Sequence, residues 1–302
     1  MPTGMLRCRV VTLLYLSAAI VVADPSCFLV RIPLKYTCVG FHSSEDFLVH
    51  VRREPPSNKT WFQLVDSQLP SLPPAAFAGL NVTMLQLKRV ELGCFDPTAS
   101  PTDNPFSGLE DTLERLIFME GTLPSSFILL SGLRKLEDLD IEYYRRLRLT
   151  RDFNHLPKSV KIIYIHRSNI EFIESGWISD LVNLEHLIFR GTDLTHFSRD
   201  LLPMPAPNLT SLDLAGNKLV SFPAGLGDGL PAPNYIKLLQ NQMKTFREQD
   251  MAPLRNKDVV IDIAFNPVQC DCNLSFILDY PSRWYYFECA SPPELKDKNI
   301  IN

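Results

Sequence analysis

Cysteines are the side chains best suited to do chemistry in this chain of 302 residues. Six follow residue 23, at positions 27, 38, 94, 270, 272 and 289. An even number predicts disulfides if the chain is exported to an oxidising compartment. We expect Cys27 and Cys38, which stand just before the repeats described below, to pair and close the N-terminal end. Zinc is the alternative for Cys270 and Cys272, but structural zinc sites need a wider spacing and four ligands, so no metal is predicted.

Export is predicted by the first 23 residues. Arg7 and Arg9 precede an apolar stretch, Val10–Val22, and small residues stand at Val21 and Ala23 before the expected cleavage. A membrane span needs about 20 apolar residues, so residues 1-23 are predicted to be a signal peptide and not an anchor. No second such segment and no hydrophobic C-terminal tail follows. We therefore predict a secreted, extracellular protein without a membrane span.

Four N-glycosylation sequons agree with that compartment. Their acceptor asparagines are Asn58, Asn81, Asn208 and Asn273. One sequon carries little weight, but four behind a signal peptide support one another. We therefore predict a glycoprotein.

No arrangement typical of an enzyme is present. The chain contains no GxSxG, HExxH or P-loop motif, and the glycines at 225, 227 and 229 are predicted to form a turn. Strand geometry separates His166 from His186 by about 13 Å, too far to share a metal. The net charge of −4 gives no reason to expect nucleic acid. We predict a non-enzyme with no catalytic residue and no cofactor.

A basic run is the last candidate for small-ligand chemistry. It consists of Arg145, Arg146, Arg148 and Arg151. Such a run could contact sulfated glycans, but acidic residues at 137, 138, 140 and 142 stand close enough to neutralise it. A solvated surface is the favoured interpretation, with weak glycan contact as the alternative.

A repeat organises the whole chain. The segment LTSLDLAGNKL, Leu209–Leu219, matches the pattern LxxLxLxxNxL at every fixed position. Eight further units align with it, and the steps between their fourth residues are 23, 31, 23, 24, 24, 25, 24 and 25. Leucine-rich repeats have periods of about 20–29 residues. The fourth residues are Phe62, Leu85, Leu116, Leu139, Ile163, Leu187, Leu212, Ile236 and Ile261.

The fold class follows from how such units bury their apolar side. Positions 4 and 6 alternate like the inward residues of a short strand, and asparagine at position 9 can bond neighbouring backbone groups. Stacked units share one core and one parallel sheet. We predict an α/β leucine-rich-repeat solenoid, a horseshoe with a concave parallel β-sheet and disulfide caps. Only Asn217, Asn241 and Asn266 keep the position-9 asparagine, so the first six turns should be less regular.

The repeats divide the chain into four parts. The signal peptide (1-23) is followed by an N-terminal cap (24-58), about nine repeats (59-268) and a cysteine-rich C-terminal cap (269-302). The 31-residue step reflects an insertion over 93-108, a proline-rich loop containing Cys94. Such a loop is either functional or a tolerated surface insertion.

The C-terminal cap resembles that of extracellular leucine-rich-repeat proteins, whose pattern is NPxxCDCxLxxL, a tryptophan and CxxPxxL. This chain reads NPVQCDCNLSFIL and then CASPPEL, with Trp284 as a loose match. The resemblance implies a Cys270–Cys289 disulfide. The fourth cysteine of the family pattern is absent, so Cys272 lacks the cysteine with which it would pair in that family. Cys94 lies about seven repeats away, roughly 30 Å, so no bond between Cys94 and Cys272 is expected. Reduced thiols, bonds to another chain and a shortened C-terminus remain open.

Positions 3, 5, 7 and 8 of each unit should face out of the concave sheet and form the binding surface. The middle units mix tyrosine, arginine and histidine with isoleucine and methionine, and aromatic residues, methionine and arginine are enriched in protein interfaces. Single surface apolar residues are also normal, but we favour a patch that binds a protein partner. Its predicted members are Met119, Asp140, Glu142, Tyr143, Tyr164, His166, Arg167, His186, Ile188 and Arg190.

Over residues 59–302 the chain is similar to secreted leucine-rich-repeat proteins. It most resembles the non-catalytic leucine-rich-repeat subunit of Oplophorus-type shrimp luciferase and its arthropod relatives. That resemblance implies a non-catalytic scaffold or accessory subunit which binds a protein partner. The alternative is a soluble innate-immune or adhesion protein resembling the extracellular parts of Toll-type or Slit-type proteins. A third hypothesis is that the protein is an enzyme. That hypothesis would require a catalytic activity that is lost when one polar residue of the concave face is replaced.

Overall fold

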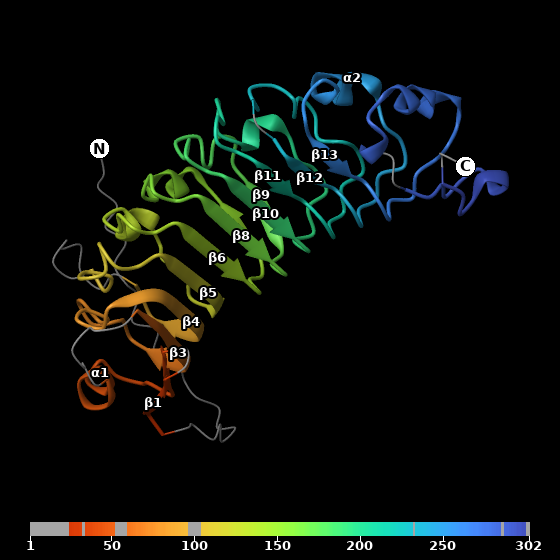
Figure 1. Ribbon diagram of the computed structural model, residues 1–302. Helices are drawn as coiled ribbons and strands as arrows, with labels where there is room; N and C mark the ends of the chain where they lie inside the picture. Colours follow the sequence, from red (N-terminus) through yellow and green to blue (C-terminus); the bar gives the residue numbers. More distant parts are fainter. Residues whose placement is uncertain are drawn as a thin grey trace, which may run out of the picture. The chain divides into compact units, whose positions relative to one another are not determined.

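The computed structural model describes residues 24–31, 34–51, 59–95, 104–231, 233–284 and 287–299. The predicted signal peptide, Asn58 and residues 96–103 of the proline-rich insertion lie outside the described residues. The chain divides into two compact units, Met1–Leu136 and Glu137–Asn302. Each unit is built on a sheet, and Figure 1 labels its strands.

The N-terminal unit begins with an antiparallel hairpin and continues as a parallel sheet. The strands are β1 (Ser26–Arg31), β2 (Leu34–Val39), β3 (Thr60–Leu69), β4 (Val82–Leu92) and β5 (Arg115–Gly121). They pair in chain order, and only the β1–β2 pair is antiparallel. A short helix, α1 (Glu45–His50), and a 3-10 helix, Phe127–Leu130, complete the unit. The predicted disulfide joins Cys27 of β1 to Cys38 of β2.

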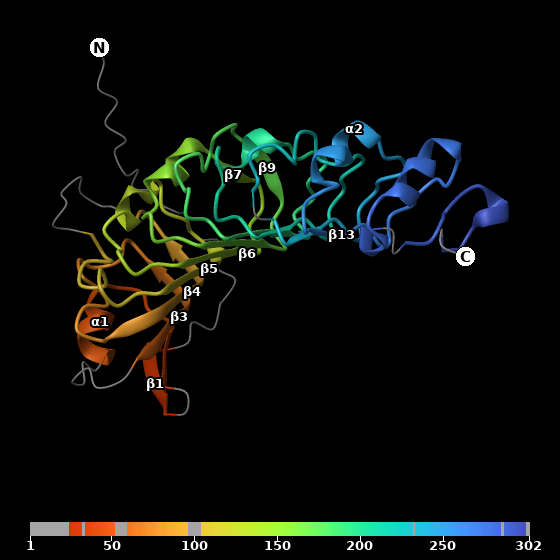
Figure 2. The same cartoon turned by 45° about the horizontal axis from the view of Figure 1, so that its top comes forward.

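The C-terminal unit is a parallel sheet with short helical arcs. The sheet contains β6 (Asp138–Glu142), β8 (Ile162–His166), β10 (His186–Arg190), β11 (Ser211–Asp213), β12 (Tyr235–Lys237) and β13 (Val260–Asp262), paired in that order. A second sheet pairs β7 (Leu147–Leu149) with β9 (Ile170–Ile173). Figure 2 shows the arcs on the side of this unit opposite the sheet. They comprise α2 (Glu248–Met251) and 3-10 helices at Arg151–His155, Arg199–Leu201, Ala252–Leu254, Cys272–Asp279, Ser282–Trp284 and Pro293–Leu295.

The predicted repeat register is confirmed. Fourth-position residues pair with one another across strands, as in Leu187 with Leu212 and Leu212 with Ile236. All nine fourth-position residues are buried, and so are all nine sixth-position residues. This alternation puts every second strand residue into the core, where apolar burial stabilises the fold by about 25 cal/mol per Å². Positions 3, 5 and 7 therefore project from the other side of the sheet.

Position 9 turns the chain by bonding buried backbone groups. Asn217, Asn241 and Asn266 are buried, and each amide donates to carbonyls of its own repeat and of the preceding one. At Ser168, one of the positions where asparagine is missing, a hydroxyl forms part of the same set of bonds. The Ser168 hydroxyl accepts from the Tyr144 amide and donates to the His166 carbonyl.

Position 8 has a left-handed backbone in all nine units, with φ between +47° and +67°. In the C-terminal unit its amide donates to the position-7 carbonyl of the next repeat, as from Tyr143 to His166 and from Gln240 to Ala264. The left-handed turn thus carries the ladder of hydrogen bonds past the end of the strand. Glycine adopts this conformation at little cost, yet only Gly191 and Gly216 have it at this position. The other seven units hold larger side chains there at the expense of strain.

Candidate protein-binding face

The exposed side of the C-terminal sheet brings most of the predicted binding residues together. We call eight of them the central patch, defined as the exposed or half-buried members on β6, β8 and β10 and in the turns that follow β6 and β8. They are Glu142, Tyr143, Tyr164, His166, Arg167, His186, Ile188 and Arg190. Strand pairing aligns Glu142 with His166 and His166 with Arg190, so neighbouring side chains lie about 4.8 Å apart across the strands. The patch is therefore a continuous surface.

Tyr143 and Arg167 form an exposed pair within the patch. Both occupy position 8 of adjacent repeats and have left-handed backbones. Arg167 donates from Nη1 to the Tyr143 hydroxyl over 2.8 Å, and its guanidinium lies 5.7 Å from the ring centroid. Each side chain restrains the other, so less side-chain entropy is lost when a partner binds. An aromatic ring beside a guanidinium is also the composition most common at interface hot spots.

His166 lies between two tyrosines on the same surface. Its ring centroid is 6.4 Å from that of Tyr143 and 5.4 Å from that of Tyr164. Burial lowers the pKa of His166, and the charges of Arg167 and Arg190 lower it further. Burial also raises the pKa of the Tyr164 hydroxyl. The aromatic centre of the patch is therefore uncharged at neutral pH.

The low pKa of His166 predicts a pH-dependent stability. Between the ordinary histidine pKa of about 6.5 and the lower folded value, the unfolded chain binds more protons than the folded one. The free energy of unfolding should therefore fall as the pH is lowered below 6.5. A His166→Gln variant should lose less stability than the wild type between pH 7 and pH 5, as measured by urea unfolding. His196→Gln, which removes an exposed imidazole outside the patch, is the control. If the free energy of unfolding changed equally with pH in all three proteins, His166 would not be the cause of the pH dependence.

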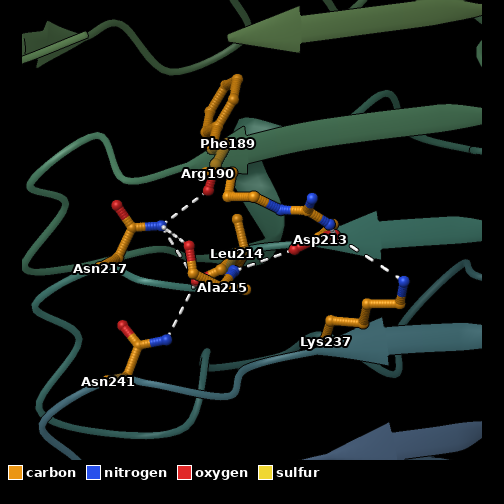
Figure 3. Close-up of polar contacts among 8 residues, drawn as sticks. All are labelled: Phe189, Arg190, Asp213, Leu214, Ala215, Asn217, Lys237 and Asn241. Carbon is orange, nitrogen blue, oxygen red and sulfur yellow. Dashed lines mark hydrogen bonds and ion pairs between the residues drawn. The ribbon is translucent and has the colours of Figure 1, made fainter. Parts of the chain in front are cut away.

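A buried carboxylate anchors the next strands along the sheet (Figure 3). The Asp213 side chain is only 3% exposed, and its Oδ2 contacts Nη2 of Arg190 and lies 3.9 Å from Nζ of Lys237. Its Oδ1 accepts from the Ala215 amide over 3.0 Å. Asp213 thereby holds Arg190 of β10 and Lys237 of β12 against the sheet. Our sequence-based site omitted Asp213 and Lys237, although both stand at position 5, like the predicted Asp140.

Two predicted members are not part of the central patch as defined above. Asp140 is on the predicted side of β6, but it is only 1% exposed, so it cannot offer a contact surface of its own. It lies in register with Tyr164 on β8. Met119 lies on β5 of the N-terminal unit, where its sulfur is 3.9 Å from Nε2 of Gln86. His186 and Ile188 are half-buried within the patch.

The predicted basic run lies beside the second sheet. Arg148 belongs to β7, and its guanidinium stands 4.7 Å from the ring centroid of Phe172 on β9. Arg151 donates to the Ser175 carbonyl over 3.1 Å and lies 3.4 Å from a carboxylate oxygen of Glu174. Arg145 and Arg146 are exposed. The run is thus partly used in internal contacts.

The C-terminal cap contains the second predicted disulfide, between Cys270 and Cys289. Trp284 is fully buried in this cap, and its Nε1 donates to the Val259 carbonyl over 2.8 Å. The Cys272 side chain is exposed.

Two predicted glycosylation asparagines, Asn208 and Asn273, are exposed as attachment requires, and Asn81 is half-buried.

Within the described ranges, no three histidine, cysteine or acidic side chains form a group that could hold a metal ion. In the same part of the chain, no helix is long and apolar enough to cross a membrane.

Comparisons with known proteins identify the fold. No protein-family model matches the chain. Over 179 residues, 57% of the chain, the sequence is 28% identical to Toll-like receptor 9 of Mus musculus, and the matched region spans only 17% of that receptor. A chain of the octameric complex of Latrophilin 3, Unc5D and FLRT2, in which FLRT2 contributes the leucine-rich repeats, aligns with a TM-score of 0.55 and 16% identity over 81% of this chain and 80% of that one. Human 5T4, also called trophoblast glycoprotein, aligns with a TM-score of 0.53 and 17% identity over 91% and 94%. The fold is a leucine-rich-repeat solenoid, as predicted.

Proposed function

We propose that this chain is a secreted, non-catalytic scaffold which binds a protein partner through the central patch. The observation that carries the proposal is the exposed Tyr143–Arg167 pair beside His166 and Tyr164. A cluster of aromatic residues and arginine on a rigid sheet has the composition of a protein-binding hot spot.

The surroundings of the patch support a preformed interface. Asp213 is buried beneath Arg190 and Lys237, so the basic side chains next to the aromatic cluster are already oriented. The strands beneath are packed through fully buried fourth and sixth positions. Little conformational entropy would therefore be lost when a partner binds, and this raises the affinity for a given contact area.

The partner is proposed to be another polypeptide of the same secretion, which would make this chain an accessory subunit. The solved complex of FLRT2 with Latrophilin 3 and Unc5D is an assembly in which a leucine-rich-repeat protein accompanies other chains. The experiment is to purify the glycosylated protein from its native secretion, measure its size and identify co-purifying chains by mass spectrometry. A larger particle with one recurring second chain is expected, and a lone monomer would contradict a constitutive complex.

The patch is tested with a double variant and a matched control. Tyr143→Ala with Arg167→Ala removes the exposed pair, whereas Phe172→Ala with Arg148→Ala removes a similar stacked pair on the second sheet. The first variant should weaken binding of the recovered partner at least about thirtyfold, the effect of losing a contact worth about 2 kcal/mol. The second should bind like the wild type. Equal affinity of the first variant and the wild type, measured by surface plasmon resonance, would exclude the patch.

A second candidate is soluble immune recognition. Similarity to Toll-like receptor 9 over more than half of this chain favours it. In that case the protein would bind microbial surfaces directly, and Arg145, Arg146, Arg148 and Arg151 are the residues proposed to contact anionic glycans. Sedimentation of the pure protein with intact bacterial or fungal cells would distinguish this function from the accessory-subunit role, which predicts no such binding.

A further inference from the structure

Phe265 is an exposed aromatic residue at a strained backbone position. It occupies position 8 of the last repeat, with φ at +56°, and it is 76% exposed. A large apolar side chain here gains little from burial and strains the backbone, whereas glycine would cost little. Gly191 and Gly216 show that other repeats of this unit use glycine at the equivalent position. Seven of the nine units accept this strain, so Phe265 is distinguished by an apolar ring that is 76% exposed.

A cavity lies directly beside Phe265. Its volume is about 430 Å³, and it opens between the turn at Phe265 and Asn266 and the C-terminal cap at Phe287, Glu288 and Cys289. Pockets for small ligands range from about 300 to 1,000 Å³, so this one can take a side chain together with part of a main chain. It is separate from the central patch, because no residue of that patch lines it.

The charged side chains among the described residues that line the cavity are all acidic. Glu288 and Asp297 are exposed and line it, and its described lining includes no lysine, arginine or histidine. The apolar part of the wall comes from the exposed Phe265, from Ala264 and Ala290, and from the largely buried Phe287. An occupant that complements this wall has a flat or apolar body and a positive charge. Arginine meets both requirements, because its planar guanidinium stacks on aromatic rings and pairs with carboxylates.

We propose that the cavity between Phe265 and the C-terminal cap binds an arginine side chain of an extended segment in a partner polypeptide. The guanidinium stacks on Phe265 and pairs with Glu288 and Asp297. The rest of the segment lies along the apolar wall. This surface is a second contact region, and it does not depend on the proposed role of the central patch.

The test uses the full chain and two synthetic peptides. The probe is fluorescently labelled acetyl-Gly-Leu-Arg-Leu-Gly amide, and its partner has citrulline in place of arginine, which keeps the shape and removes the charge. Fluorescence anisotropy should show about tenfold tighter binding of the arginine peptide. Equal affinity for both peptides, or no saturable binding at millimolar peptide, would overturn the proposal.

Variants separate binding from folding. Phe265→Gly and Glu288→Gln should each weaken binding of the arginine peptide several-fold. Gln240→Gly is the matched control, since Gln240 has φ at +55° at the same repeat position but does not line the cavity. Both glycine variants should keep or raise the melting temperature, because strain is relieved, and only Phe265→Gly should lose binding. Wild-type affinity in Phe265→Gly would also overturn the proposal.

Discussion

Replacing Asn217 with alanine should lower the free energy of unfolding by about 3–4 kcal/mol. The Asn217 side chain is buried, and its Oδ1 accepts from the amides of Thr192 and Leu194. Its Nδ2 donates over 2.7 Å to the Phe189 carbonyl and over 2.9 Å to the Leu214 carbonyl (Figure 3). Alanine would leave these backbone groups buried without partners, and each such group costs about 1–3 kcal/mol.

Asn169 provides the matched control for that experiment. It stands one position later in its repeat, and its exposed side chain makes one long contact of 3.4 Å with Asp193. Asn169→Ala should change the free energy of unfolding by less than about 0.5 kcal/mol. Urea unfolding followed by circular dichroism measures both variants. If the two variants lost similar amounts of unfolding free energy, the hydrogen bonds of the buried Asn217 side chain would not contribute to stability as proposed.

Removing the C-terminal disulfide is expected to have a comparable effect. Replacing both Cys270 and Cys289 with serine should lower the free energy of unfolding by about 3 kcal/mol. The bond closes a loop with a sequence separation of 19, and both cysteines are buried. Without it the unfolded chain gains conformational freedom. The loop also contains Trp284, which is buried and bonded to the Val259 carbonyl, so the cap should loosen where it covers the last repeat.

A Cys272→Ser variant is the control, because it removes a nearby cysteine that is not part of the Cys270–Cys289 disulfide. The Cys272 side chain is exposed and lies two residues from Cys270. Cys272→Ser should leave the unfolding midpoint unchanged. Thermal unfolding of the oxidised proteins, followed by circular dichroism, compares the two variants directly. If Cys272→Ser destabilised the chain as much as the double replacement, the stability would not come from the Cys270–Cys289 bond.

The repeat register could be predicted because it depends on local periodicity. Alternation at positions 4 and 6 is a property of one strand, and the step between units brings equal positions into register. Leu187 thus pairs with Leu212, and Asn217, Asn241 and Asn266 are all buried as their spacing indicates. The Cys27–Cys38 and Cys270–Cys289 bonds were also predicted, the first from its place before the repeats and the second from the family resemblance.

Position within the repeat was a poorer guide to exposure. Asp140, Tyr164 and Asp213 all stand at position 5, yet the two aspartates are buried and Tyr164 is half-buried. A short side chain on a sheet is covered by longer neighbours on the adjacent strands. Burial of Asp213 by Arg190 and Lys237 therefore depends on residues about 24 positions away in either direction. The alternation of residues along one strand does not show which side chains of the neighbouring strands will cover a given residue.

The sequence by itself determined the repeat, its register, the inward face of each strand and the ends that needed closing, because each follows from spacing along one chain. Only the tertiary structure decided which outward side chains form a surface. It joined Arg167 to Tyr143, buried Asp140 and Asp213, and set Phe265 beside a cavity of the C-terminal cap. The physical reason is that exposure and pairing on a sheet depend on the sizes and charges of side chains from neighbouring repeats, which meet only when the repeats stack.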